Sequence, residues 1–169
     1  SFIFVAAFLG YSIGTAPLVS YHYGAGNREE LKNLFRKSLV IIGLLSVVLT
    51  ALGEGLAGPL ARLFVGYDDA LCGMTVRAFI LYSFSYLLAG VNIYGSSFFT
   101  ALNDGLVSAT ISFARTFAFQ IAAVLLLPSL MPEGMQLDGI WLSVTAAELA
   151  SLCVTVWFLV CKRRRYRSA

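Results

Sequence analysis

Long apolar stretches alternate with short polar gaps along most of this chain. The apolar stretches cover about residues 2–21, 39–60, 79–101, 106–130 and 140–160. Each is close to the ~20 residues that an α-helix needs to cross a hydrocarbon core about 30 Å thick. The pattern therefore predicts an all-α, polytopic membrane helix bundle with five transmembrane helices, at approximately residues 1–22, 38–61, 77–101, 106–130 and 139–161.

The composition supports a membrane protein. Of the 169 residues, 59% are hydrophobic and 12% are charged, and the mean hydropathy is +0.81. A soluble domain of this length cannot cover so much apolar surface. We expect residues 1–161 to form one transmembrane domain and residues 162–169 to form a basic tail.

The basic residues gather in two of the polar gaps. One group follows the first apolar stretch and the other follows the fifth: Arg28, Lys32, Arg36 and Lys37, then Lys162, Arg163, Arg164, Arg165 and Arg167. The positive-inside rule places both groups in the cytoplasm, which five crossings satisfy if residue 1 lies outside. This predicts a multi-pass protein of the plasma (inner) membrane with a cytoplasmic C-terminus. A basic tail can also bind nucleic acid, but its place after a membrane helix explains it without such a partner.

The first basic gap also predicts a short helix. Asn27 can cap a helix that has Glu30 in its first turn, and the apolar side chains of Leu31 and Phe35 share one face. We expect this helix to lie on the cytoplasmic membrane surface, separate from the second membrane helix.

Polar residues recur at helical spacing through the third apolar stretch. They form a stripe of residues Tyr82, Ser85, Tyr86, Asn92, Ser96, Thr100 and Asn103. Such a stripe must face other helices or water, because lipid offers it no partner. Hydrogen bonding between helices is one interpretation; a cavity is the other, and the two tyrosines favour it. On the second interpretation Tyr82, Tyr86, Asn92 and Ser96, with Gln120 at similar depth in the fourth helix, are candidate substrate-binding residues.

Two charged residues are predicted to lie deep in the membrane. Counting ~1.5 Å per residue places Arg115 roughly 13 Å from the basic side of the fourth helix and Glu148 roughly 20 Å from that side of the fifth, whereas Glu54 falls near the outer boundary. A charge at the centre costs about 2.5 to 3.5 kcal/mol on insertion scales. Because the fourth and fifth helices are joined by a short connection, we expect Arg115 and Glu148 to form a structural ion pair.

The sequence offers little for catalysis. His22 is the only histidine, the three cysteines are scattered, and no glycine-rich loop carries a lysine for phosphate binding. We therefore expect no enzymatic activity, no metal site and no cofactor.

Three segments carry a resemblance to a known family. They are GYSIGTAPLVSYHYGAGNREELK at residues 10–32, NIYGSSFFTALNDGLVSATISFAR at residues 92–115, and LDGIWLSVTAAE at residues 137–148. Together they resemble the second half of multidrug and toxic compound extrusion (MATE) transporters. One departure is His22, which stands where the family usually has asparagine.

The resemblance implies a fold and a function. Family members have two six-helix lobes, so this chain would supply helices eight to twelve of the C-terminal lobe, with the N-terminal lobe as its missing partner. They export organic cations and other amphipathic compounds by alternating access, driven by H⁺ or Na⁺. Some carry an acidic coupling residue in the tenth helix, but residues 79–101 contain no Asp or Glu. The missing lobe would then supply the coupling site, with Glu148 as the candidate in this chain.

Two alternatives remain open at this point. One is a lipid-linked oligosaccharide flippase of the same superfamily, for which Arg115 alone offers little positive charge to meet a diphosphate. The other is a small membrane scaffold protein. Because the chain begins at Ser1 within an apolar stretch, we expect upstream sequence, which favours the transporter.

Overall fold

The chain folds as a bundle of helices in the computed structural model, which describes residues 2–132 and 134–162. The elements are α1 (Phe2–Gly24), α2 (Arg28–Val65), α3 (Asp69–Ser83), α4 (Ser85–Ala101), α5 (Gly105–Phe113), the π-helix η1 (Ala114–Phe119), α6 (Gln120–Leu130) and α7 (Gln136–Lys162). They build five spans, within the described residues, that are long and apolar enough to cross a membrane. This confirms the predicted all-α, polytopic fold.

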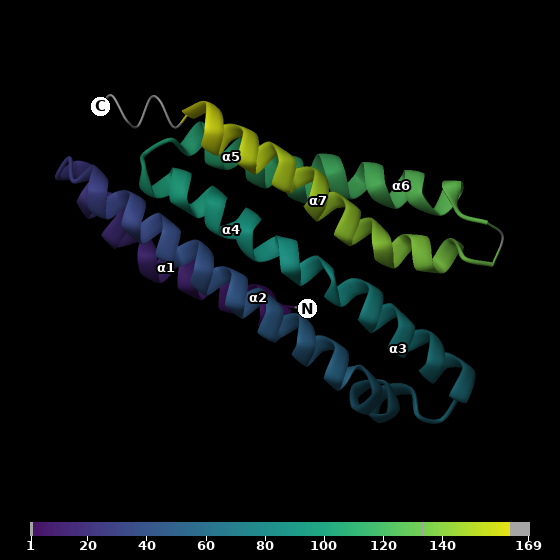
Figure 1. Cartoon of the computed structure of the whole chain (residues 1–169). Coiled ribbons are helices and arrows are strands. Elements are labelled where there is room, and N and C mark those ends of the chain that lie inside the picture. The colour runs from purple at the N-terminus through teal and green to yellow at the C-terminus, as the bar shows by residue number, and fades with distance from the viewer. Residues whose placement is uncertain (1, 133, 163–169) are drawn as a thin grey trace.

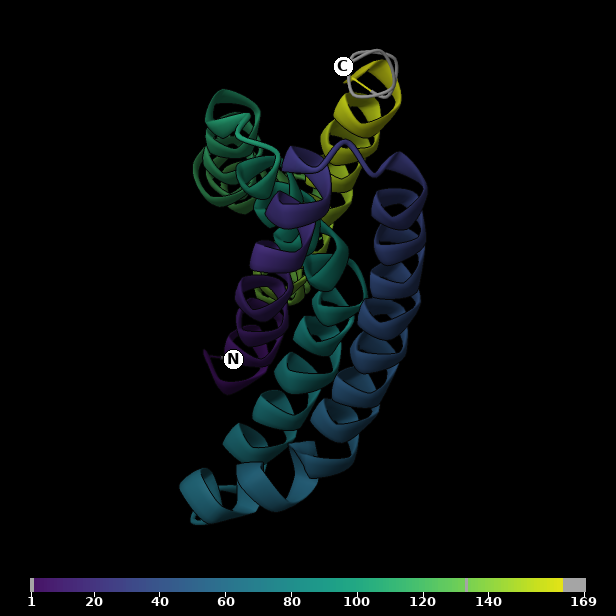
Figure 2. The same ribbon diagram turned by 90° about the vertical axis from the view of Figure 1, so that its left-hand side faces the viewer.

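The helix α4 lies at the centre of the bundle. The helices α1, α2, α5 and α7 all pack against it, and Figure 1 shows it between the α1–α2 pair and the α5–α7 side. Figure 2 shows α2 running beside both α3 and α4 along the length of the bundle. We call the end with Arg28, Lys32 and Lys162 the basic end, and the end with Asp68 and Asp138 the acidic end.

Glycines let the other helices approach α4 closely. A Cβ atom on Gly90 would lie 2.7 Å from the ring of Phe8 in α1 and 2.7 Å from the hydroxyl of Ser46 in α2. A Cβ atom on Gly95 would lie 2.5 Å from the Thr155 methyl group in α7. Small residues at such crossings favour membrane helix packing, because lipid tails give two helices no hydrophobic reason to associate.

Apolar and aromatic side chains fill the space around α4 in two clusters. Phe8, Ile42, Tyr86 and Tyr94 belong to the cluster between α1, α2 and α4. The second cluster lies toward the basic end and joins α1, α2, α4 and α5: Val19, Leu31, Phe99, Leu102, Val107 and Ile111. Together they fix the position of α4 relative to α1 and α2.

The prediction of a separate surface helix after residue 27 is wrong. Asn27 does cap a helix, accepting a hydrogen bond from the Glu30 backbone N–H at 3.2 Å, but that helix continues without interruption to Val65. Leu31 packs into the second apolar cluster instead of lying on a membrane surface. Ser38, at the predicted start of the second membrane helix, is buried and accepts a hydrogen bond from the Tyr11 hydroxyl at 3.0 Å.

Two membrane spans depart from regular α-helix. The third is interrupted at Phe84, where the Leu87 backbone N–H donates to the Phe84 carbonyl. Hydroxyl groups from neighbouring helices support the carbonyls near this point: Thr50 donates to Ser83 at 3.3 Å and Thr145 donates to Leu81 at 3.4 Å. The fourth span contains η1 at its centre. Neighbouring polar side chains commonly satisfy backbone groups freed inside membranes.

Ion pairs connect α7 to its neighbours near both ends. Arg77 of α3 contacts Asp138 at 2.6 Å near the acidic end, and Lys162 contacts Asp104 at 2.8 Å at the basic end. The predicted basic tail beyond Lys162, residues 163–169, lies outside the described residues.

The Gly90 contact gives a direct test of this packing. We expect Gly90→Ala to lower stability by about 1 to 3 kcal/mol, because Phe8 is fully buried and its ring has no room to move. Gly43→Ala is the matched control, since a Cβ atom there meets nothing within 4 Å. Thermal unfolding in detergent measures both, and equal stability of the two variants would contradict the packing of α1 on α4.

Candidate functional site

Asn92 forms the centre of a buried polar network between α4 and α7. Its side chain is fully buried. The amide nitrogen donates to the backbone carbonyl of Glu148 at 2.9 Å and to its carboxylate Oε2 at 2.8 Å. The Thr155 hydroxyl donates to the amide oxygen at 3.0 Å. These contacts use both N–H groups of the amide, so its orientation follows from its partners.

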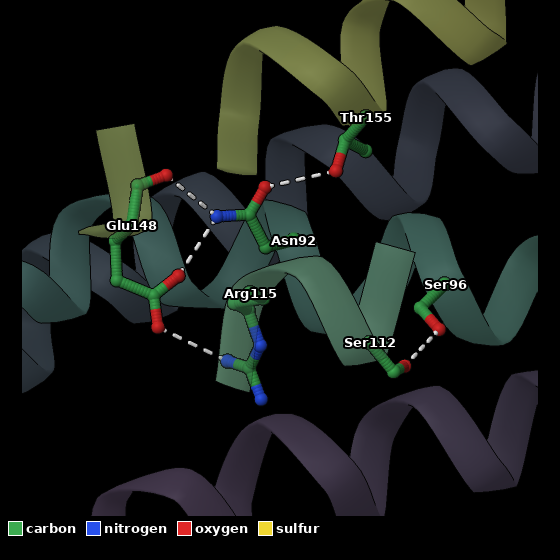
Figure 3. A network of polar contacts seen from close by, with 6 residues as sticks. All are labelled: Asn92, Ser96, Ser112, Arg115, Glu148 and Thr155. Atoms are coloured by element: carbon green, nitrogen blue, oxygen red, sulfur yellow. Dashed lines mark hydrogen bonds and ion pairs between the residues drawn. The ribbon is translucent and has the colours of Figure 1, made fainter. Parts of the chain in front are cut away.

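Arg115 extends this network to the fourth membrane span. Its Nη1 atom lies 3.1 Å from Oε1 of Glu148, with exposed side-chain fractions of 24% for Arg115 and 11% for Glu148. The carboxylate thus accepts from an amide on one oxygen and a guanidinium on the other, as Figure 3 shows. We call Asn92, Arg115, Glu148 and Thr155 the Glu148 network. The two charges predicted to meet do lie in contact.

The arrangement explains how both charges lie within membrane spans. An unpaired carboxylate or guanidinium in hydrocarbon carries a large desolvation cost, and a close pair with further hydrogen bonds offsets much of it. Removal of either partner leaves the other uncompensated.

A second polar group lies one helical turn along α4. Ser96 and Thr100 face Ser108 and Ser112 of α5, and the hydroxyl oxygens follow one another at 2.7 to 2.9 Å. We call these four residues the hydroxyl cluster. It holds α4 and α5 together next to the Glu148 network (Figure 3).

The other predicted site residues occupy different surroundings. Tyr86 is buried, with its ring edge-on to Phe4 at 5.0 Å and to Tyr82 at 5.6 Å. Tyr82 is partly buried, and Gln120 is partly buried at the start of α6. None of the contacts described for residues 2–132 and 134–162 joins these three side chains to the Glu148 network.

The expected orientation of Asn92 toward a cavity differs from the structure. Its amide faces α7, and Gly95 one turn away allows α7 to come close enough to cover it. Of the two interpretations of the polar stripe, interhelical hydrogen bonding describes Asn92 and Ser96 as they lie here. Among the described residues, no group of three or more His, Cys, Asp or Glu side chains gathers in one place.

Comparison with known proteins identifies the family. A model of the MatE family matches residues 1–125. The chain belongs to the MatE family. No curated protein and no solved structure matches it. MatE proteins are membrane transporters of the MATE superfamily, and this MatE chain is accordingly a multi-pass membrane protein of a transporter family.

Sequence reasoning did not find two features of this MatE chain. The π-helix η1 has no glycine or proline in its sequence ARTFAF, so no breaker signals it. Ser108 and Ser112 were not predicted as partners of Ser96, although four-residue spacing on both helices was a signal that could have revealed the hydroxyl cluster. The matched range of the MatE model includes Asn92 and Arg115, while Glu148 lies beyond it.

A double-mutant cycle tests the ion pair. Arg115→Ala and Glu148→Ala should each lower stability by about 3 to 5 kcal/mol, because each leaves a charge within a membrane span without its partner. The double variant should lose less than the sum of the two, by about 0.5 to 3 kcal/mol. The pair Arg77 and Asp138 is the control. Its arginine side chain is 60% exposed, so coupling there should stay below about 1 kcal/mol. Additive losses at Arg115 and Glu148 would show that the two do not interact.

Proposed function

We propose that this chain forms part of a cation-coupled exporter in which Glu148 takes up the coupling ion, H⁺ or Na⁺. The observation that carries the proposal is the position of Glu148: a carboxylate in a membrane-spanning helix, nearly buried, with acceptors turned toward Asn92 and Arg115. Ionisable groups inside membrane spans commonly belong to ion or substrate pathways. Membership of the MatE family supports transport as the activity.

The proposed cargo is organic cations or amphipathic compounds. Tyr82 and Gln120 are partly exposed and offer an aromatic face and an amide to such compounds. In this proposal, Tyr86, Asn92 and Ser96 do not contact the cargo. They hold together the helices that carry the binding surface. A diphosphate-bearing lipid suits the chain less well, because Arg115 is already paired with Glu148.

The proposed orientation places the basic end in the cytoplasm. The basic residues Arg28, Lys32 and Lys162 lie at that end, in agreement with the positive-inside rule. An alternating-access cycle requires two halves that close on each other around the substrate. We therefore propose that a second, N-terminal lobe of the same protein completes the transporter, with membrane lipids around both.

Glu148→Gln tests the proposal in the intact protein. The substitution keeps the shape of the side chain and removes its charge, so we expect loss of ion-driven export when efflux is normalised to the amount of protein in the membrane. Dye efflux from proteoliposomes is measured under a proton gradient and, separately, under a sodium gradient, and the gradient that drives the unsubstituted protein names the ion.

Glu54→Gln is the matched control, because Glu54 is an exposed acid in α2 and should leave efflux unchanged. Full efflux by Glu148→Gln under the driving gradient would remove Glu148 from coupling. Absence of efflux from the unsubstituted protein under both gradients would favour a membrane scaffold.

A further inference from the structure

The fourth membrane span changes its packing partner at η1. Before it, α5 packs on α4, where the hydroxyl cluster joins the two helices. After it, α6 packs on α7, and Gly139 lies so close to the Pro128 backbone that a Cβ atom would stand 3.1 Å away. No residue of α6 is fully buried by the rest of the chain. The two halves of one span therefore belong to different packing groups.

The third membrane span is divided at Phe84 in a similar way. Its first half, α3, is attached to the first half of α7 by the Arg77–Asp138 ion pair and by the hydrogen bond from Thr145 to the Leu81 carbonyl. We call α3, α6 and residues 136–148 the acidic-end unit. Figure 1 shows these segments at the same end of the bundle.

A separate set of contacts holds the other half of the structure together. Thr155 of α7 bonds to Asn92 of α4 and lies against Gly95, and Lys162 pairs with Asp104 before α5. We call α4, α5 and residues 149–162 the basic-end unit. The two units are joined through Phe84, through η1, along α7 and along the unbroken helix α2, which packs on both α3 and α4.

Glu148 lies where the two units meet. Its carboxylate accepts from Asn92 in the basic-end unit and from Arg115, which is the second residue of η1. A π-helix is a rare, locally widened turn that often marks a functional position. The sequence of η1 contains no proline or glycine that would explain its irregular backbone. The ion pair of Arg115 with Glu148 is the charged interaction that fixes η1 against α7.

The remaining charged groups that flank α7 are engaged elsewhere. Arg77 pairs with Asp138 and Asp104 pairs with Lys162, near opposite ends of the helix. The sequences of α5 and α6 contain no charged residue. The tyrosines of α4, Tyr86 and Tyr94, belong to the cluster facing α1 and α2. Among the described contacts, the charge acting directly on the Glu148 carboxylate is that of Arg115.

We propose that the acidic-end unit turns on the basic-end unit about Phe84 and η1, and that the charge of Glu148 controls this motion. With the carboxylate ionised, Arg115 holds η1 against α7. A proton or sodium ion on the carboxylate weakens that hold and releases η1. The inference rests on the proposed function for the ion, while the hinge itself follows from the packing.

Helix α7 bends in this motion, since it runs unbroken through the level of Glu148. The α3 part of the acidic-end unit moves against α2, which packs on both α3 and α4. The Ser143 hydroxyl already donates to the Ile140 carbonyl at 2.6 Å. Such bonds from a serine to its own helix compete with the backbone ladder and favour bending. The bend therefore falls on the acidic-end side of Glu148.

Distances between spin labels test the hinge in the intact protein, reconstituted in lipid nanodiscs. Cys72, Cys153 and Cys161 are first replaced by serine. Labels at Leu106 in α5 and Leu126 in α6 report across η1, and both side chains are exposed. A control pair, Leu106 and Val156, reports within the basic-end unit.

Glu148→Gln should shift the mean distance between residues 106 and 126 by more than about 2 Å, the upper range of common helix shifts in switching proteins. The distance between 106 and 156 should stay as in the unsubstituted protein, and Glu54→Gln should change neither. An unchanged 106–126 distance, or equal shifts in both pairs, would overturn the hinge.

The unsubstituted protein supplies a second measurement, which does not depend on the folding of a variant. The 106–126 distance is measured at neutral pH in sodium and, separately, at acidic pH in potassium. One of these two conditions should reproduce the shift seen in Glu148→Gln, and that condition identifies the coupling ion. No shift under either condition overturns control by Glu148. If Glu148→Gln shifts the distance but leaves efflux unchanged, the hinge stands and Glu148 has no role in coupling. If it abolishes efflux but leaves the distance unchanged, Glu148 has a role in coupling and the hinge is contradicted.

Discussion

The need to satisfy polar groups inside hydrocarbon governs this structure. Lipid offers no hydrogen bonds, so a buried charged or amide group needs its partner within the protein. Asn92, Arg115 and Glu148 meet this requirement together, because each supplies what another lacks. The close approach of α4 and α7 at Gly95 and Thr155 is the packing condition that makes their contact possible.

The same requirement places the irregular parts of the fold. The interruption at Phe84 is supported by hydroxyls of Thr50 and Thr145, and η1 is tied to α7 through Arg115. Irregular backbone at membrane depth thus coincides with polar side chains from neighbouring helices. A transporter needs helices that change shape without exposing unpaired backbone groups, and the proposed hinge places the change of shape at these two positions.

Much of the fold could be predicted from the chain, because apolar length and charge placement directly reflect the membrane. The pairing of Arg115 with Glu148 also followed from depth and from the short connection between their helices. The orientation of Asn92 did not, since a polar stripe has the same spacing whether it faces water or another helix. The continuity of α2 depends on tertiary contacts of Leu31 and Ser38, which the sequence does not show. The π-helix η1 contains no helix-breaking residue from which it could be predicted.

The contact between Arg115 and Glu148 can be measured most directly by solid-state NMR in lipid bilayers. Nitrogen labelling of arginine side chains and carbon labelling of glutamate carboxyls reports the dipolar coupling between the two groups, with Arg115→Lys and Glu148→Gln to assign the signal. We predict a coupling between an arginine nitrogen and a glutamate carboxyl carbon that is consistent with the 3.1 Å N···O contact and disappears in either variant. Absence of any arginine–glutamate coupling that depends on these two residues would contradict it.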